Sequence, residues 1–320
     1  MDRRELLRKI TALPITASFL AEDLLAGDFR SVFRGQGIEF DEARRYEPGD
    51  DIRSIDWNAS ARFGVPYVKM YREERELTVL IVLDTSATMF SGGPVLEPEA
   101  GAPALPSRYE QGLLAAALIA FSAERTGQRL GALFFDREVD RVFPPRKGRR
   151  HTMAVLSGAL RFQGPPRPPS RGSNLGAALA GAGRLLKRRS LVVLISDFFC
   201  LNWERELGDL ARRHDVIALR IRDPLDGDMP NLGLIPMEDP ETGVRFHAPT
   251  GFFSFRAAWA QWHGEREQLW ASLCRRAGAA CLDLSTADDA AQRLFHFFGG
   301  PYYQARFHRN GGSQRRRGGL

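Results

Sequence analysis

Apolar runs and amphipathic stretches alternate along residues 77–300. Nearly uninterrupted apolar runs, which predict buried strands, lie at 77–83, 129–136, 190–197, 215–223 and 279–286. Stretches with apolar residues three and four positions apart, which predict helices, lie at 108–127, 150–161, 174–189, 203–214, 255–278 and 288–298. Buried strands alternating with amphipathic helices are typical of a mainly parallel sheet covered on both faces. The pattern therefore predicts a doubly wound α/β fold of the Rossmann type.

Two hairpins interrupt this alternation. The first joins strands at 129–136 and 139–145 through a turn at Arg137–Glu138. The second covers residues 230–251, with its turn at Pro240–Gly243. We expect the second hairpin to be an excursion at the edge of the main sheet.

The chain divides into four parts by texture. Residues 1–30 have helical spacing and predict an N-terminal helical arm, whereas 31–76 consist of short aromatic and β-branched pieces broken by Gly and Pro. That second part is predicted to be β-rich, and Trp57 within it alternates with apolar residues, so we expect it to be a core anchor. The α/β domain covers 77–300, and a basic tail predicted to be disordered covers 301–320.

Charge gives limited support to a polyanion partner. The 320 residues carry a formal net charge of +6, and part of the excess lies in the tail. The basic clusters at 146–151, 187–190 and Arg315–Arg317 are scattered and are not interleaved with aromatic residues. Nucleic-acid binding is therefore only an alternative.

Cysteine content and hydropathy indicate a cytoplasmic protein. Cys200, Cys274 and Cys281 form no C-x-x-C pair and are predicted to be packing thiols in a reducing compartment. The longest apolar run after the N-terminal region, at 113–121, is about half the length that a membrane-spanning helix needs. The apolar stretch at 10–27 contains acidic residues and lacks a clear cleavage site, so no signal peptide is predicted.

The end of the first predicted strand carries candidate metal ligands. Asp84, Ser86 and Thr88 follow one another at two-residue intervals, and oxygen donors of this kind suit Mg²⁺. Ser173 precedes a predicted helix and Asp197 ends a predicted strand, so both are further ligand candidates. The alternative is that Asp84 and Ser86 only cap the helix that follows.

This set of residues resembles the metal-ion-dependent adhesion site of von Willebrand factor A domains. The resemblance rests on D-x-S-x-T at Asp84, on G-S-N-L around Ser173, and on a strand-terminal Asp197. It implies that hydroxyls bind the metal directly, that the aspartates often act through water, and that one position is left for an acidic group of a partner. Thr88 stands where Ser is usual and Ser173 where Thr is usual, so each exchange keeps the hydroxyl.

A second resemblance covers residues 33–84 and continues through "KRRSLVVLISDF". "RYEPGDD", "IDWNASAR" and "YVK" before the first strand resemble the signature of the domain-of-unknown-function-58 family. That resemblance implies a von Willebrand factor A-like fold and a partnership with a MoxR-type AAA+ ATPase.

Together these observations predict a non-catalytic module that uses Mg²⁺, or another divalent cation such as Mn²⁺, to bind a protein. The expected partner is a MoxR-type ATPase or a client that supplies an acidic residue. No G-x-x-x-x-G-K-[ST], H-E-x-x-H or G-x-S-x-G motif occurs, and no histidine falls within the metal motif. A metal-dependent hydrolase remains an alternative, since a carboxylate can serve as base. The proline-containing loop at 92–107 is expected to border the site, either as a gate or as a neutral insertion.

Overall fold

The computed structural model describes residues 36–47, 50, 55–74, 77–92, 105–162 and 172–299, and only the backbone of 36–43 and 69–74. The predicted helical arm at 1–30, the tail at 301–320 and most of the 92–107 loop lie outside the described residues. The chain forms two units, one of residues 33–77 and a larger one that contains residues 78–299.

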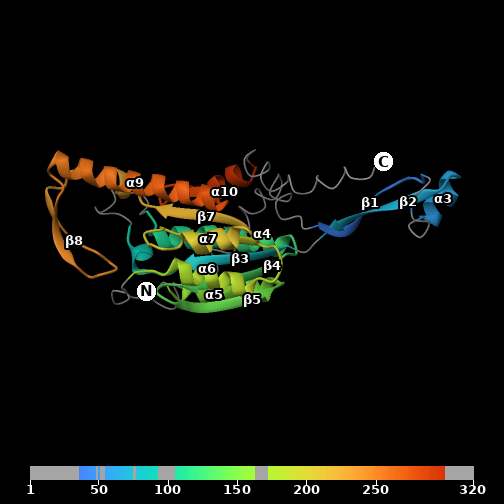
Figure 1. Cartoon of the computed structure of the whole chain (residues 1–320), viewed down its shortest axis with the longest axis horizontal. Helices are drawn as coiled ribbons and strands as arrows, with labels where there is room; N and C mark the ends of the chain where they lie inside the picture. The colour runs from blue at the N-terminus through green and yellow to red at the C-terminus, as the bar shows by residue number, and fades with distance from the viewer. Residues whose placement is uncertain are drawn as a thin grey trace. The chain divides into compact units, whose positions relative to one another are not determined.

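A six-stranded sheet forms the centre of the larger unit (Figure 1). Its strands in spatial order are β10 (Ala280–Ser285), β7 (Asp215–Arg222), β6 (Leu191–Ser196), β3 (Thr78–Asp84), β4 (Arg129–Phe135) and β5 (Val139–Arg146). All neighbouring pairs are parallel except β4 and β5, which form the first predicted hairpin. The prediction of a mainly parallel α/β sheet is therefore confirmed.

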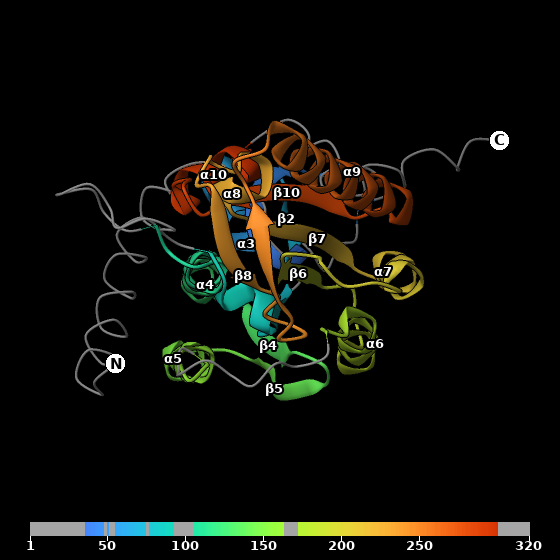
Figure 2. The same ribbon diagram turned by 90° about the vertical axis from the view of Figure 1, so that its left-hand side faces the viewer.

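Helices cover both faces of this sheet (Figure 2). One face carries α4 (Arg108–Arg125), α5 (Arg149–Leu160) and α10 (Ala290–Gly299). The other carries α6 (Leu175–Leu185), α7 (Glu204–Ala211) and α9 (Phe253–Ala277). Strands β3 and β6 are buried along nearly their whole length, as their continuous apolar sequences require in a sheet covered on both sides. None of the helices in the described part of the chain has the length and apolar composition needed to cross a bilayer.

The strand order reverses beside β3. The chain leaves β3 toward β4 and β5 on one side and then returns to β6 on the other side. Because β3 and β6 are parallel, with Val82 opposite Leu194 and Leu83 opposite Ile195, their carboxyl ends lie next to each other. Such a reversal is where ligands bind in open α/β sheets.

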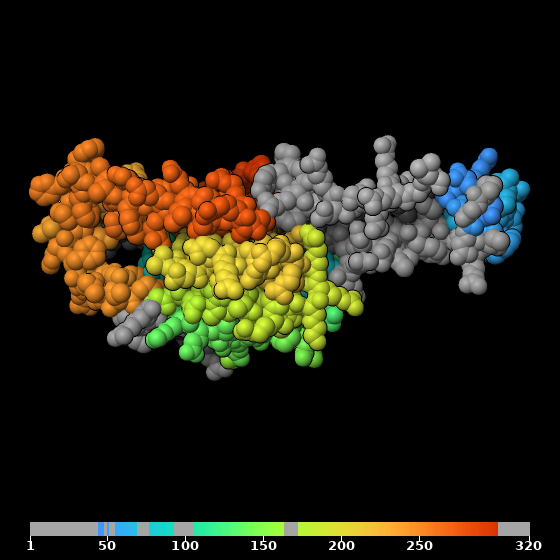
Figure 3. Space-filling model, viewed as in Figure 1, coloured from blue at the N-terminus to red at the C-terminus, as the bar shows by residue number. Residues whose placement is uncertain are grey.

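The second hairpin is confirmed, but its expected place at the sheet edge is wrong. Strands β8 (Leu234–Glu238) and β9 (Arg245–Pro249) pair only with each other and form a separate two-stranded sheet. The edges of the main sheet are β5 and β10, and the hairpin instead stands over the carboxyl ends of the strands (Figure 2). In the space-filling view the hairpin and the start of α9 project beyond the rest of the unit (Figure 3).

The smaller unit combines a strand pair with a short helix. Strands β1 (Gln36–Arg45) and β2 (Tyr67–Glu74) are antiparallel, and α3 (Trp57–Phe63) lies between them in sequence. Asp56 begins this helix by accepting hydrogen bonds from the amides of Asn58 and Ala59 at 3.0 and 3.1 Å. The expectation that Trp57 is a core anchor is wrong, because its side chain is 69% exposed. Trp57 lies in a helix, where side chains repeat every 3.6 residues, so alternation with apolar neighbours does not predict that its side chain is buried.

Candidate metal centre

Asp84 ends β3 and lies fully buried at the carboxyl edge of the sheet. Its Oδ1 accepts a hydrogen bond from the Ser86 amide at 2.9 Å, and its Oδ2 accepts one from the Ser196 hydroxyl at 2.6 Å. Ser86 stands at the start of a 3₁₀ helix, η2 (Ala87–Phe90), but its side chain makes no capping hydrogen bond. The Ser86 hydroxyl lies instead 3.2 Å from Thr88 Oγ1. The alternative expectation of a helix cap is therefore wrong for Ser86.

Asp197 follows the neighbouring strand β6 and is also buried. Its Oδ1 accepts the Phe199 amide at 3.0 Å, whereas its buried Oδ2 makes no hydrogen bond of normal length to any described residue. Burial raises the pKa of Asp197, and the charge of Arg108 opposes part of that rise. Burial and the charge of Asp197 raise the pKa of Asp84 to about 8. The two carboxylates therefore form a buried pair that lacks enough positive charge around it.

Ser173 lies in the turn before α6, and the Asn174 amide of this turn donates a hydrogen bond at 2.8 Å to the carbonyl of Asp136, the residue that follows β4. Burial and the charge of Asp84 raise the pKa of the Cys200 thiol to about 12, while a hydrogen bond with Ser173 opposes the rise. The same thiol therefore lies close to Ser173 and to Asp84. The structure brings the three predicted ligand segments to one end of the sheet.

Two residues at this edge escaped the sequence analysis. Arg108, the first residue of α4, pairs with Asp226 at 2.5 Å. Its Nη1 donates to Ser91 Oγ at 2.6 Å and to the Thr88 carbonyl at 3.4 Å, so it ties the η2 segment to α4. Glu241, in the turn of the β8–β9 hairpin, accepts hydrogen bonds from Thr88. These contacts join segments that are far apart in sequence, so no local sequence motif predicts them.

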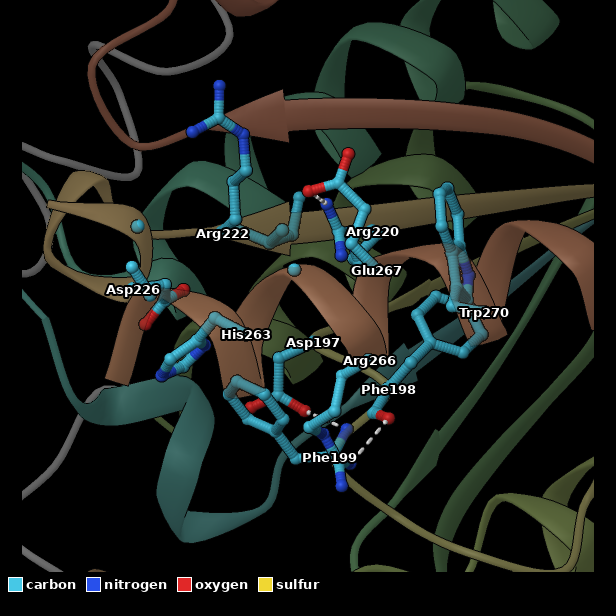
Figure 4. Close-up of a pocket in the computed structure, with 14 residues that line it drawn as sticks. Asp197, Phe198, Phe199, Arg220, Arg222, Asp226, His263, Arg266, Glu267 and Trp270 are labelled. Carbon is cyan, nitrogen blue, oxygen red and sulfur yellow. Dashed lines mark hydrogen bonds and ion pairs between the residues drawn. The ribbon is translucent and has the colours of Figure 1, made fainter. Parts of the chain in front are cut away.

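A cavity of about 130 Å³ opens next to Asp197. Figure 4 shows its lining, which includes Arg220, His263, Arg266 and Trp270. Arg220 is neutralised by Asp283 and Glu267. Burial lowers the pKa of His263, and its Nε2 is buried without a hydrogen-bond partner among the described residues.

The donor set at the sheet edge fits a hard divalent cation. Such ions prefer carboxylate, hydroxyl and water oxygens, and a cation would supply the charge that Asp84 and Asp197 lack. The unsatisfied Oδ2 of Asp197 supports this fit. No cluster of three or more His, Cys, Asp or Glu side chains able to hold a metal occurs among the described residues. Hydroxyls and water would therefore be among the other ligands of a cation held by Asp84 and Asp197.

Solved structures that are similar to this chain include conserved hypothetical protein BatB from Bacteroides thetaiotaomicron. It is 15% identical, with a TM-score of 0.44, over 69% of this chain and 96% of that chain. An aerotolerance-related membrane protein from Bacteroides fragilis is also 15% identical, with a TM-score of 0.43, over 73% of this chain and 97% of that chain.

Relatives in sequence include uncharacterised proteins of Mycobacterium bovis and Mycobacterium tuberculosis. Each is 33% identical over 245 residues, which cover 76% of this chain and 74% of the relative. The family model described as "Protein of unknown function DUF58" matches residues 42–268. That match includes the candidate metal centre and most of the sheet. The chain therefore belongs to the DUF58 family.

Proposed function

We propose that this chain is a divalent-metal-dependent protein-binding module with a von Willebrand factor A-like domain, acting as partner or adaptor of a MoxR-type AAA+ ATPase in the cytoplasm. The observation that carries the proposal is the buried pair of carboxylates at the reversal of strand order. The residues that would hold Mg²⁺ or Mn²⁺ are Asp84, Ser86, Thr88, Ser173 and Asp197. The cation would supply an electrophilic centre for a carboxylate of the partner.

The burial of these residues supports access from one side. Asp84 and Ser86 are fully buried, whereas Thr88 and Ser173 are half-buried. The buried groups form the base of the site and the half-buried hydroxyls form its mouth. An acidic side chain from another protein would approach at the mouth, where charge complementarity confers specificity.

The partner is proposed from the family. Membership of the DUF58 family supports the earlier resemblance, which implies a MoxR-type ATPase. Basic clusters give less support to a polyanion partner, because Arg189 in one of them is already paired with Asp215 at 2.6 Å.

Retention of the host's MoxR-type ATPase tests the proposal. We expect the immobilised full chain to retain the ATPase in Mg²⁺ and to release it in EDTA, and we expect Asp84→Ala to abolish retention. Asp209→Ala removes an exposed carboxylate on α7 and should leave retention unchanged. Circular dichroism shows whether each variant is folded. Equal retention in Mg²⁺, in EDTA and by Asp84→Ala would remove the metal from the function.

Metal-dependent hydrolysis is the second candidate function, and the placement of His263 favours it. His263 lines the same cavity as Asp197, and a neutral imidazole can act as general base. On this function, Mg²⁺-dependent turnover of p-nitrophenyl phosphate would fall about 100-fold or more in His263→Ala. Turnover that is absent, or equal in both proteins, would contradict a role of His263 in hydrolysis.

A further inference from the structure

The turn of the β8–β9 hairpin presents one acidic side chain to the mouth of the candidate metal centre. Oε1 of Glu241 lies 3.2 Å from both the amide nitrogen and the hydroxyl oxygen of Thr88. Its Oε2 accepts the Gly172 amide at 2.9 Å. The carboxylate thus bridges the two segments that carry Thr88 and Ser173, the half-buried hydroxyls of the mouth.

The turn is built to hold Glu241 in this position. Asp239 Oδ1 accepts the Glu241 amide at 2.9 Å, and Asp239 Oδ2 accepts the Thr242 hydroxyl at 2.7 Å. The Asp239 carbonyl accepts the Gly243 amide at 2.7 Å, and Gly243 has a φ of 71°, which glycine adopts without strain. A fixed turn lowers the conformational entropy that Glu241 loses on reaching the site.

A second observation also points to a ligand at this place. Asp197 is 4% exposed, and its buried Oδ2 makes no hydrogen bond of normal length to any described residue, although the Thr88 side chain is near enough to lower the pKa of this carboxyl. Asp84, fully buried, is near enough for the two carboxylates to repel each other. A divalent cation between these groups and the mouth would attract the carboxylate of Glu241 as well.

We propose that Glu241 is an internal acidic ligand of this centre and that it occupies the position into which a partner's carboxylate would bind. This inference rests on the proposed function and adds a regulatory step to it. The hairpin is then a competitor within the same chain, and a partner must displace Glu241 before its own acid binds the metal. Because the competitor is tethered, its effective concentration is high, so weak external acids are rejected.

Mn²⁺ and acetate are sufficient probes for a test on the full chain. We expect Glu241→Gln to bind Mn²⁺ about tenfold more weakly than the wild type in calorimetry, because a carboxylate ligand is lost. In the presence of saturating Mn²⁺, we expect Glu241→Gln to bind acetate several-fold more tightly than the wild type. EDTA should abolish acetate binding in both proteins.

Glu238→Gln is the matched control. Glu238 lies in the same hairpin, and its half-exposed carboxylate pairs at 2.6 Å with the exposed Arg245. This variant should bind Mn²⁺ and acetate as the wild type does. Equal melting temperatures of the two variants would show that the hairpin remains folded.

The outcomes separate this inference from the proposed function. Mn²⁺ binding of equal affinity in wild type and Glu241→Gln, with unchanged acetate affinity, would overturn the internal ligand and leave the metal centre in place. Absence of Mn²⁺ binding to the wild type and to both variants would overturn the metal centre and the internal ligand together.

Discussion

Without divalent cations, the protein is expected to lose stability as the pH rises from about 4 to about 8. Burial and the charge of Asp197 raise the pKa of Asp84 from 3.8 to about 8. In this pH range the unfolded chain releases the proton of Asp84 while the folded chain keeps it. Ionisation therefore favours the unfolded state, and the free energy of unfolding falls by on the order of 1 kcal/mol for each pH unit. Stabilisation by protonated Asp84 is complete below pH 4 and is lost above pH 8.

Urea unfolding in EDTA at several pH values measures this slope. Asp84→Asn, which has nearly the same shape and no charge to lose, should make the pH dependence less steep and be more stable than the wild type at pH 8. The slope that remains is due in part to Asp197, because burial raises the pKa of that carboxyl as well. Asp209→Asn, at an exposed position on α7, should keep the wild-type slope. Mg²⁺ should restore stability to the wild type at pH 8, because it replaces the proton as the positive charge at Asp84. A slope that is the same in the wild type and Asp84→Asn would contradict this assignment.

The sequence predicted the part of the site that depends on strand ends. Asp84 and Asp197 each follow a buried apolar run, and in a parallel sheet the carboxyl ends of strands share one edge. Their adjacency also requires β3 and β6 to be neighbours, which the reversal of strand order provides. Periodicity and topology rules are sufficient for this level of prediction.

The position of Glu241 at the candidate metal centre could not be predicted from hydrophobic periodicity. The sequence predicted its hairpin and even its turn, yet placed that hairpin at the sheet edge. Where a hairpin docks depends on contacts of its side chains with distant segments, and Glu241 and Thr88 are separated by 153 residues. Trp57 shows the same limit for local structure. The Asp56 side chain caps a helix at this point, so Trp57 lies in a helix and not in the alternating strand that the sequence pattern predicted. Such side-chain contacts depend on tertiary structure, so no periodic pattern in the sequence predicts them.

Replacing Arg108 by Leu is expected to lower the free energy of unfolding by about 3–5 kcal/mol. The side chains of Arg108 and Asp226 are only 8% and 14% exposed, and their atoms Nη2 and Oδ1 are 2.5 Å apart. Leucine fills part of the volume but leaves the buried carboxylate of Asp226 without its cation. The cost of an uncompensated buried charge exceeds the gain from added apolar contact.

The same change should weaken cation binding at the candidate metal centre, because Arg108 also holds the segment that carries Thr88. Loss of its hydrogen bonds to Ser91 Oγ and the Thr88 carbonyl frees the η2 segment, and we expect Mn²⁺ affinity to fall about tenfold. Arg212→Leu is the matched control, because Arg212 is 72% exposed and its ion pair with Asp209 contributes at most about 1 kcal/mol. Urea unfolding and Mn²⁺ calorimetry on both variants separate the two roles. If Arg108→Leu loses stability but keeps wild-type Mn²⁺ affinity, Arg108 supports the fold and not the candidate metal centre. If Arg108→Leu and Arg212→Leu both lose equally little stability, the buried ion pair contributes no more to stability than the exposed one.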